Sequence, residues 1–167
     1  MNQQEFIKLY DKNVAAIYRY IFLKVSSKEV AQDLTSEVFL RAWNRLNADN
    51  PSEVKNPRAF LYQIARNLTV DFYRQKSRTE ISLDNIEFQI PDLDDNPAEK
   101  ANLGLELEPI RSALGEIKTD YAEVIIWHYL DELTVPEIAD ILDKTEGAVR
   151  VMLSRALEKI RDNLEEK

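Results

Sequence analysis

Apolar side chains recur every three or four residues along most of the chain, which is the spacing of helices with one buried face. Three long runs of this kind cover residues 6–22, 27–46 and 57–76. Their apolar positions are Phe6, Leu9, Tyr10, Val14, Ile17, Ile21 and Phe22, then Val30, Leu34, Val38, Ala42 and Leu46, then Phe60, Ile64, Leu68 and Phe72. Alternation long enough for a sheet is missing, so the pattern predicts an all-α protein.

Local signals place the helix ends. Ser26 and Glu29 have the spacing of a capping box, which predicts the start of the second helix, and Pro57 suits the first turn of the third. A second box at Thr134 and Glu137 predicts a short helix, and the turn 143–145 separates it from a last long one.

The character of the chain changes after Arg78. Residues 79–110 carry nine Asp or Glu against one Lys, and Pro91 and Pro97 interrupt regular structure. We therefore predict two small helical domains, 1–78 and 106–167, joined by an acidic flexible linker over 79–105.

Composition excludes several classes of site. The 167 residues include three Gly, one His and no Cys. Gly-rich phosphate loops, disulfides, thiolate metal sites and His clusters are therefore excluded. No apolar run reaches the length of a membrane span. We expect a cytoplasmic protein that is not an enzyme, with no catalytic residue, metal or cofactor and no membrane partner.

The net charge of −8 argues against a nucleic-acid partner until it is divided along the chain. Residues 55–78 hold six cations against one acid, a surplus of +5, and residues 144–161 hold five against two, a surplus of +3. Binding responds to the local potential, because salt screens charges within about 8–10 Å. The two basic islands therefore matter more than the total.

The second island lies in the pattern of a helix-turn-helix. The last helix carries Val149, Leu153 and Ala156 on one stripe and basic side chains on the other side. This arrangement is typical of a recognition helix that enters the major groove of DNA. A simple helical hairpin with a solvated basic face is the alternative.

The first island interleaves cations and aromatics on one sector of the helix 57–76, at Arg58, Tyr62, Arg66 and Tyr73. Such a face suits single-stranded nucleic acid, because cations contact phosphates and rings stack on exposed bases. A solvated face whose rings cover core edges is an equally good interpretation.

The outer face of the helix 27–46 mixes charge with one apolar residue, Leu40. It could dock a partner helix, although the pattern alone favours ordinary surface with one stray leucine.

These three features, in this order, resemble an extracytoplasmic-function (ECF) sigma factor, a small subunit that starts transcription with bacterial RNA polymerase. Three blocks carry the resemblance, at residues 31–43, 57–68 and 133–156. It implies sigma domain two, the linker, and sigma domain four with its helix-turn-helix. It also implies a promoter-specificity subunit that binds core polymerase, recognises the −35 and −10 elements and promotes initiation.

The resemblance also implies the site residues. Core polymerase would bind Asp33, Glu37, Leu40 and Arg41. The melted −10 element would contact Arg58, Tyr62, Arg66, Asn67, Asp71, Arg74, Lys76 and Arg78. The duplex −35 element would contact Lys144, Thr145, Glu146, Arg150, Ser154, Arg155 and Lys159. An anti-sigma factor is common in the family, and the free form is expected to be a monomer.

The chain departs from the family pattern at four positions, of which Phe60 in place of a frequent Trp is a conservative exchange. Glu132 and Asp143 stand where the family usually has Gly, and Met152 stands where it often has a basic residue. Two alternative functions remain open. One is a stand-alone helix-turn-helix regulator, and the other is a sigma-like protein that binds polymerase or an anti-sigma factor without reading DNA.

Overall fold

The computed structural model describes residues 1–25, 27–48, 54–79 and 112–166, and every regular element among them is helical. The elements are α1 (Gln3–Val25), α2 (Lys28–Leu46), α3 (Pro57–Thr79), α5 (Thr119–Ile125), the π-helical turn η1 (Ile126–Leu130), α6 (Val135–Leu142) and α7 (Glu146–Glu165). The all-α prediction is confirmed. The predicted linker lies outside the described residues from position 80 onward.

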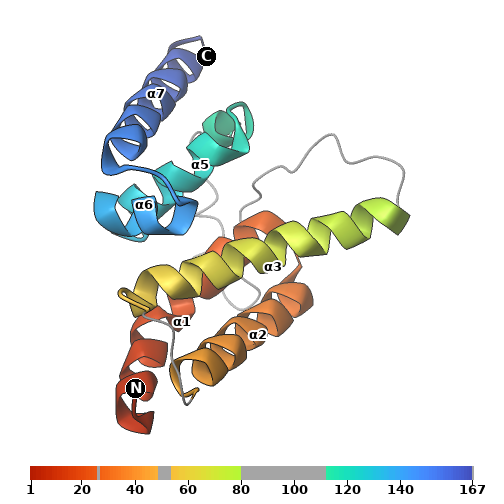
Figure 1. The fold of residues 1–167 in the computed structure, drawn as a ribbon. Coiled ribbons are helices and arrows are strands. Elements are labelled where there is room, and N and C mark those ends of the chain that lie inside the picture. The colour runs from red at the N-terminus through yellow and green to blue at the C-terminus, as the bar shows by residue number, and fades with distance from the viewer. Residues whose placement is uncertain (26, 49–53, 80–111, 167) are drawn as a thin grey trace, which may run out of the picture.

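The helices form two groups, and α3 of the first group lies beside α6 of the second (Figure 1). Helices α1, α2 and α3 pack on one another around fully buried Ile17, Ile21, Val38 and Leu61. Aromatic rings close the rim of this group, since Phe6 meets Trp43 edge-on at 5.0 Å between centroids. The second group comprises α5, η1, α6 and α7, and α6 packs against α3.

The N-cap of α2 lies one residue later than predicted. Ser27, not Ser26, is the N-cap, and its hydroxyl accepts a hydrogen bond from the Val30 N–H at 3.3 Å. Because the cap shifts by one residue, Val30 takes the third helical position and Glu29 cannot complete a capping box. The predicted cap residue, Ser26, lies outside the described residues.

The helix-turn-helix forms as predicted. Thr134 and Glu137 make both hydrogen bonds of a capping box at the start of α6. Thr145 caps α7 by accepting a hydrogen bond from the Ala148 N–H at 3.1 Å. Val149, Leu153 and Ala156 are buried along one stripe of α7, which leaves its opposite side to solvent.

Among the residues that the structure describes, two other than glycine hold left-handed backbone, Glu132 with φ 57° and Asp143 with φ 52°. These are the two positions at which the family resemblance leads one to expect glycine. Asp143 ends α6 as its C-cap, and Asp accepts this conformation better than most residues. Glu132 has no such advantage, so it is the more strained of the two.

We expect Glu132→Gly to stabilise the chain by about 0.5–1 kcal/mol. Left-handed backbone costs a residue with a Cβ about 1–2 kcal/mol, and the greater unfolded-state freedom of Gly cancels roughly 0.5–1 kcal/mol of the gain. Urea unfolding followed by circular dichroism measures the change.

Glu158→Gly is the matched control, because Glu158 is an exposed residue inside α7. Glycine there should destabilise the chain by about 1 kcal/mol. Equal losses from both substitutions would show that Glu132 is not strained.

Candidate polymerase and nucleic-acid interfaces

The outer face of α2 is open to solvent. Leu40 is 55% exposed, and Arg41 pairs with Glu37 at 2.6 Å beside it, while Asp33 is exposed one turn earlier. The opposite side of α2, with Ala31, Val38 and Ala42, already fills the core. Leu40 is therefore an apolar spot that the fold of its own domain does not use.

The outer face of α7 and its entry turn is also exposed, and it bears every residue predicted for the −35 element. These residues are Lys144, Thr145, Glu146, Arg150, Ser154, Arg155 and Lys159. Arg150 pairs with Glu146 at 3.1 Å across one helical turn, a contact that solvent weakens. Met152 is half-buried against the core instead of lying on this face.

The residues predicted for the −10 element fall into two sets on α3. Asn67, Asp71, Arg74 and Lys76 are exposed, and the side chain of Arg78 lies outside the described part of the chain. Arg58, Tyr62 and Arg66 instead face the second helical group, and Tyr62 is fully buried.

Asp131 lies at the first of two buried ion clusters between the helical groups. Its carboxylate pairs with Arg19 of α1 and accepts a hydrogen bond from the Tyr62 hydroxyl at 2.9 Å. Its backbone carbonyl accepts a hydrogen bond from Arg58. Burial raises the pKa of Asp131, and Arg19 opposes that shift. One acidic residue thus holds side chains from both α1 and α3.

Glu123 lies at the second cluster and is 1% exposed. It pairs with Lys24 of α1, and its other oxygen accepts a hydrogen bond from Arg66 Nε at 3.1 Å. The Tyr20 hydroxyl donates a third hydrogen bond at 3.1 Å. Burial, together with the nearby Arg66 charge, lowers the pKa of Lys24 to about 7, so the guanidinium of Arg66 is the constant cation at this site.

Three aromatic rings separate the two clusters. Trp127 is fully buried and lies 5.6 Å from Tyr20 and 6.3 Å from Tyr62 between ring centroids. Its indole N–H has no hydrogen-bond partner within the described residues, and neither does Arg58 Nε. The contact between the groups is therefore apolar at its centre and incompletely satisfied in its polar atoms.

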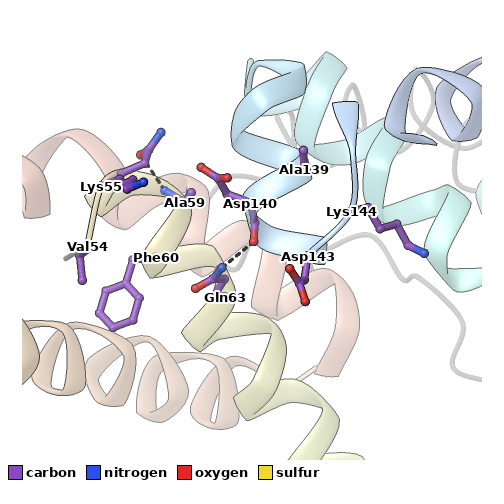
Figure 2. A pocket seen from close by; sticks show the side chains of 10 residues that line it. Val54, Lys55, Ala59, Phe60, Gln63, Ala139, Asp140, Asp143 and Lys144 are labelled. Carbon is purple, nitrogen blue, oxygen red and sulfur yellow. Dashed lines mark hydrogen bonds between the residues drawn. The ribbon is translucent and has the colours of Figure 1, made fainter. Parts of the chain in front are cut away.

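A cleft of about 410 Å³ runs between α3 and α6 at one edge of this contact (Figure 2). Gln63 donates a hydrogen bond across it to the Asp140 carbonyl at 2.6 Å. A second groove, of about 370 Å³, lies between the C-terminal half of α3 and the start of α5. Arg66 and Arg74 line it from α3, and Asp120 lines it from α5.

Glu123, Asp131 and Trp127 are the residues that the sequence pattern did not single out as a site. The signal was present, because Glu123 and Asp131 are carboxylates flanking the nearly apolar stretch 124–130. Charges in such a run are rarely left without partners. The π-helical turn η1 also contributes, because its wider winding brings both Trp127 and Asp131 into the contact between the helical groups.

Two Sigma-70 families match the chain. Sigma-70 region 2 matches residues 9–79, and Sigma-70 region 4 matches residues 107–160. The ECF RNA polymerase sigma factor SigW of Bacillus subtilis is 30% identical over 173 residues, covering 98% of this chain and 90% of the relative. This chain belongs to the ECF sigma factors. It is a promoter-specificity subunit of RNA polymerase.

Other relatives agree with this assignment. The sigma factor SigM of Bacillus subtilis is 27% identical over 155 residues, and the aligned region covers 92% of this sigma factor and 91% of SigM. The sigma factor BldN of Streptomyces coelicolor is 30% identical over 153 residues, and this chain spans 57% of its length.

Solved structures share the fold of this sigma factor. CnrH in complex with the cytosolic domain of CnrY superposes with a TM-score of 0.70 at 24% identity, covering 99% of this chain and 91% of CnrH. RpoE bound to the anti-sigma factor NepR, from Bartonella quintana, gives 0.64 at 18% identity and covers 97% and 98% of the two chains. In the part of this sigma factor that the structure describes, no helix is long and apolar enough to span a membrane.

The buried tyrosines make the contact sensitive to alkali. Burial raises the pKa values of Tyr20 and Tyr62 above the ordinary 10.0. Above about pH 10 the unfolded chain releases these protons while the native chain keeps them, so stability falls as pH rises, with no such effect below pH 10. We expect phenolate absorbance from these two residues to appear only together with loss of native circular dichroism.

Tyr62→Phe is the comparison for this titration, and it should remove one late phenolate. Ionisation of all seven tyrosines in a chain that retains its native spectrum would contradict the burial of Tyr20 and Tyr62.

Proposed function

We propose that three surfaces divide the work of this sigma factor. The outer face of α2 binds core polymerase, α7 reads the −35 element in the major groove, and α3 reads the melted −10 element. The observation that carries the proposal is α7, where basic side chains line the exposed side of a helix-turn-helix and the opposite stripe is buried. Domains 1–78 and 106–167 would place these surfaces on two bodies.

On α2, Leu40 supplies the apolar anchor for a partner helix. Asp33, Glu37 and Arg41 surround it with charges of both signs, which orient a partner more than they add affinity. A largely exposed leucine with nothing of its own domain on it fits a protein contact better than ordinary surface does.

On α3, the exposed residues Asn67, Asp71, Arg74 and Lys76 supply polar contacts for a displaced strand. Arg58, Tyr62 and Arg66 would add two phosphate contacts and one stacking ring once the second helical group moves away. Base flipping costs a few kcal/mol, which favours easily unpaired sequence and helps melting begin.

The partners proposed for this sigma factor are core RNA polymerase, promoter DNA and an anti-sigma factor, and the free chain is proposed to be a cytoplasmic monomer. The anti-sigma partner draws support from the complexes in which the similar folds were solved. The acidic linker is proposed to thread a polymerase channel built for nucleic acid.

Run-off transcription with core polymerase on a library of promoter sequences tests the function. We expect initiation from a subset of sequences only when this chain is present. Core binding without initiation would contradict the proposal and support a titrating protein. Duplex binding that core does not affect would support a stand-alone regulator.

Asp33→Ala combined with Leu40→Ala should weaken core binding about tenfold or more, because truncating a central anchor typically removes 1–2 kcal/mol or more. Binding of labelled core by this variant measures the change. Lys8→Ala with Asp11→Ala on exposed positions of α1 is the control, and equal affinity of both variants would refute the α2 surface.

Arg150→Ala should weaken −35 binding and reduce the slope of log affinity against log salt by about one unit, because one phosphate contact releases about one counterion. Arg161→Ala removes the same charge farther along α7 and should leave the slope nearly unchanged. An unchanged slope for Arg150→Ala would remove this residue from the DNA surface.

A further inference from the structure

Three residues of α3 have two competing partners. Arg58, Tyr62 and Arg66 belong to the −10 surface under the proposed function, yet in the structure they contact the second helical group. Tyr62 cannot stack on a base while it is fully buried between Tyr20 and Trp127. Arg66 cannot hold a phosphate at full strength while Glu123 accepts its hydrogen bond.

Acidic residues of the second helical group occupy the cations of α3 that would otherwise bind DNA phosphates. Glu123 offers a carboxylate oxygen to Arg66. Asp131 offers its backbone carbonyl to Arg58, and its carboxylate pairs with Arg19 of α1 and accepts the hydrogen bond of the Tyr62 hydroxyl. Asp120 and Glu137 extend the acidic surface, with ion pairs of 3.7 Å to Arg66 and 3.6 Å to Arg58. Helices α5 and α6, together with Asp131 directly after η1, therefore present acidic residues to α3 along its first three turns.

We propose that Glu123 and Asp131 form an internal latch that closes the −10 surface of the free chain and that must open before the melted strand can bind. The proposal rests on the proposed role of α3. It assigns to α5 and η1 a function in regulating DNA binding that is separate from −35 recognition by α7.

The closed latch leaves the proposed surfaces on α2 and α7 exposed. Leu40 on α2 stays 55% exposed and the side chain of Arg150 on α7 stays 62% exposed while the latch is closed. Helix α3 lies between α2 and the second group, so the core-binding face points away from the contact (Figure 1). The closed chain can therefore meet polymerase and duplex DNA before it exposes its strand-binding residues.

The contact is also built to open. Arg58 Nε and Trp127 Nε1 are buried without hydrogen-bond partners in the described part of the chain, and each regains a water partner on opening. Two buried carboxylates regain hydration as well, which offsets part of the loss of their ion pairs. Such a contact favours the closed state and still allows the open state to form.

The test uses Glu123→Gln with Asp131→Asn in the full chain. Because the protein has no Cys, Lys12→Cys and Glu158→Cys can carry a donor and an acceptor dye on the two groups. We expect energy transfer to fall in the variant. We also expect affinity for a pool of random single-stranded DNA to rise about tenfold, since a competent state populated at 10% or less weakens apparent binding by that factor.

Asp162→Asn with Glu165→Gln is the matched control, because it removes the same two charges from exposed positions of α7. It should change neither readout appreciably. Unchanged energy transfer in the latch variant would overturn the latch. A fall in transfer without tighter DNA binding would overturn the gating role and point instead to a failure of the −10 assignment.

A second variant keeps the proposal testable if the latch variant does not fold. Gln63→Cys and Asp140→Cys lie on facing sides of the cleft in Figure 2 and can be joined by a short bis-maleimide. We expect the joined chain to bind core polymerase normally and to lose single-stranded DNA binding. The same cysteines blocked separately with a mono-maleimide are the control, and equal DNA binding by both would overturn the proposal.

Discussion

Two buried carboxylates determine how the halves of this sigma factor meet. Glu123 and Asp131 sit in a contact whose centre is three aromatic rings, where an unpaired charge would be very costly. Glu123 pairs with Lys24 of α1 and Arg66 of α3, and Asp131 pairs with Arg19 of α1 and accepts a hydrogen bond from Tyr62 of α3. The position of the second group is therefore set by polar contacts as well as by shape. Removing Glu123 takes the ion-pair partner from buried Lys24, and removing Asp131 takes the acceptor from the buried Tyr62 hydroxyl.

This arrangement connects the uneven charge of the chain to its function. The basic island on α3 would attract any nucleic acid if it were fully open. In the closed chain two of its cations, Arg58 and Arg66, pair with acidic side chains of α6 and α5. The acidic surplus thus contributes specific contacts in addition to a diffuse repulsion, and it acts on the surface that we propose to read melted DNA.

Sequence periodicity predicted the helices, including the helix-turn-helix, because burial within each helical group follows a local repeat. The capping box at Thr134 and the left-handed turn at Asp143 are local in the same sense. The role of Tyr62 was beyond this kind of prediction. A residue on an apparently free helix face becomes core only when a segment sixty-nine positions away supplies Asp131, and helical spacing carries no information about such a contact. The cap of α2 shifted by one residue because Ser26 and Ser27 offer the same chemistry.

Energy transfer between dyes on α1 and α7 of the otherwise unaltered chain tests the central claim most directly. We predict high energy transfer in the free chain and in complexes with polymerase and duplex promoter DNA. We predict a fall when core polymerase and an opened promoter are both present. Transfer that is already low in the free chain, or that stays high in the open promoter complex, would contradict it.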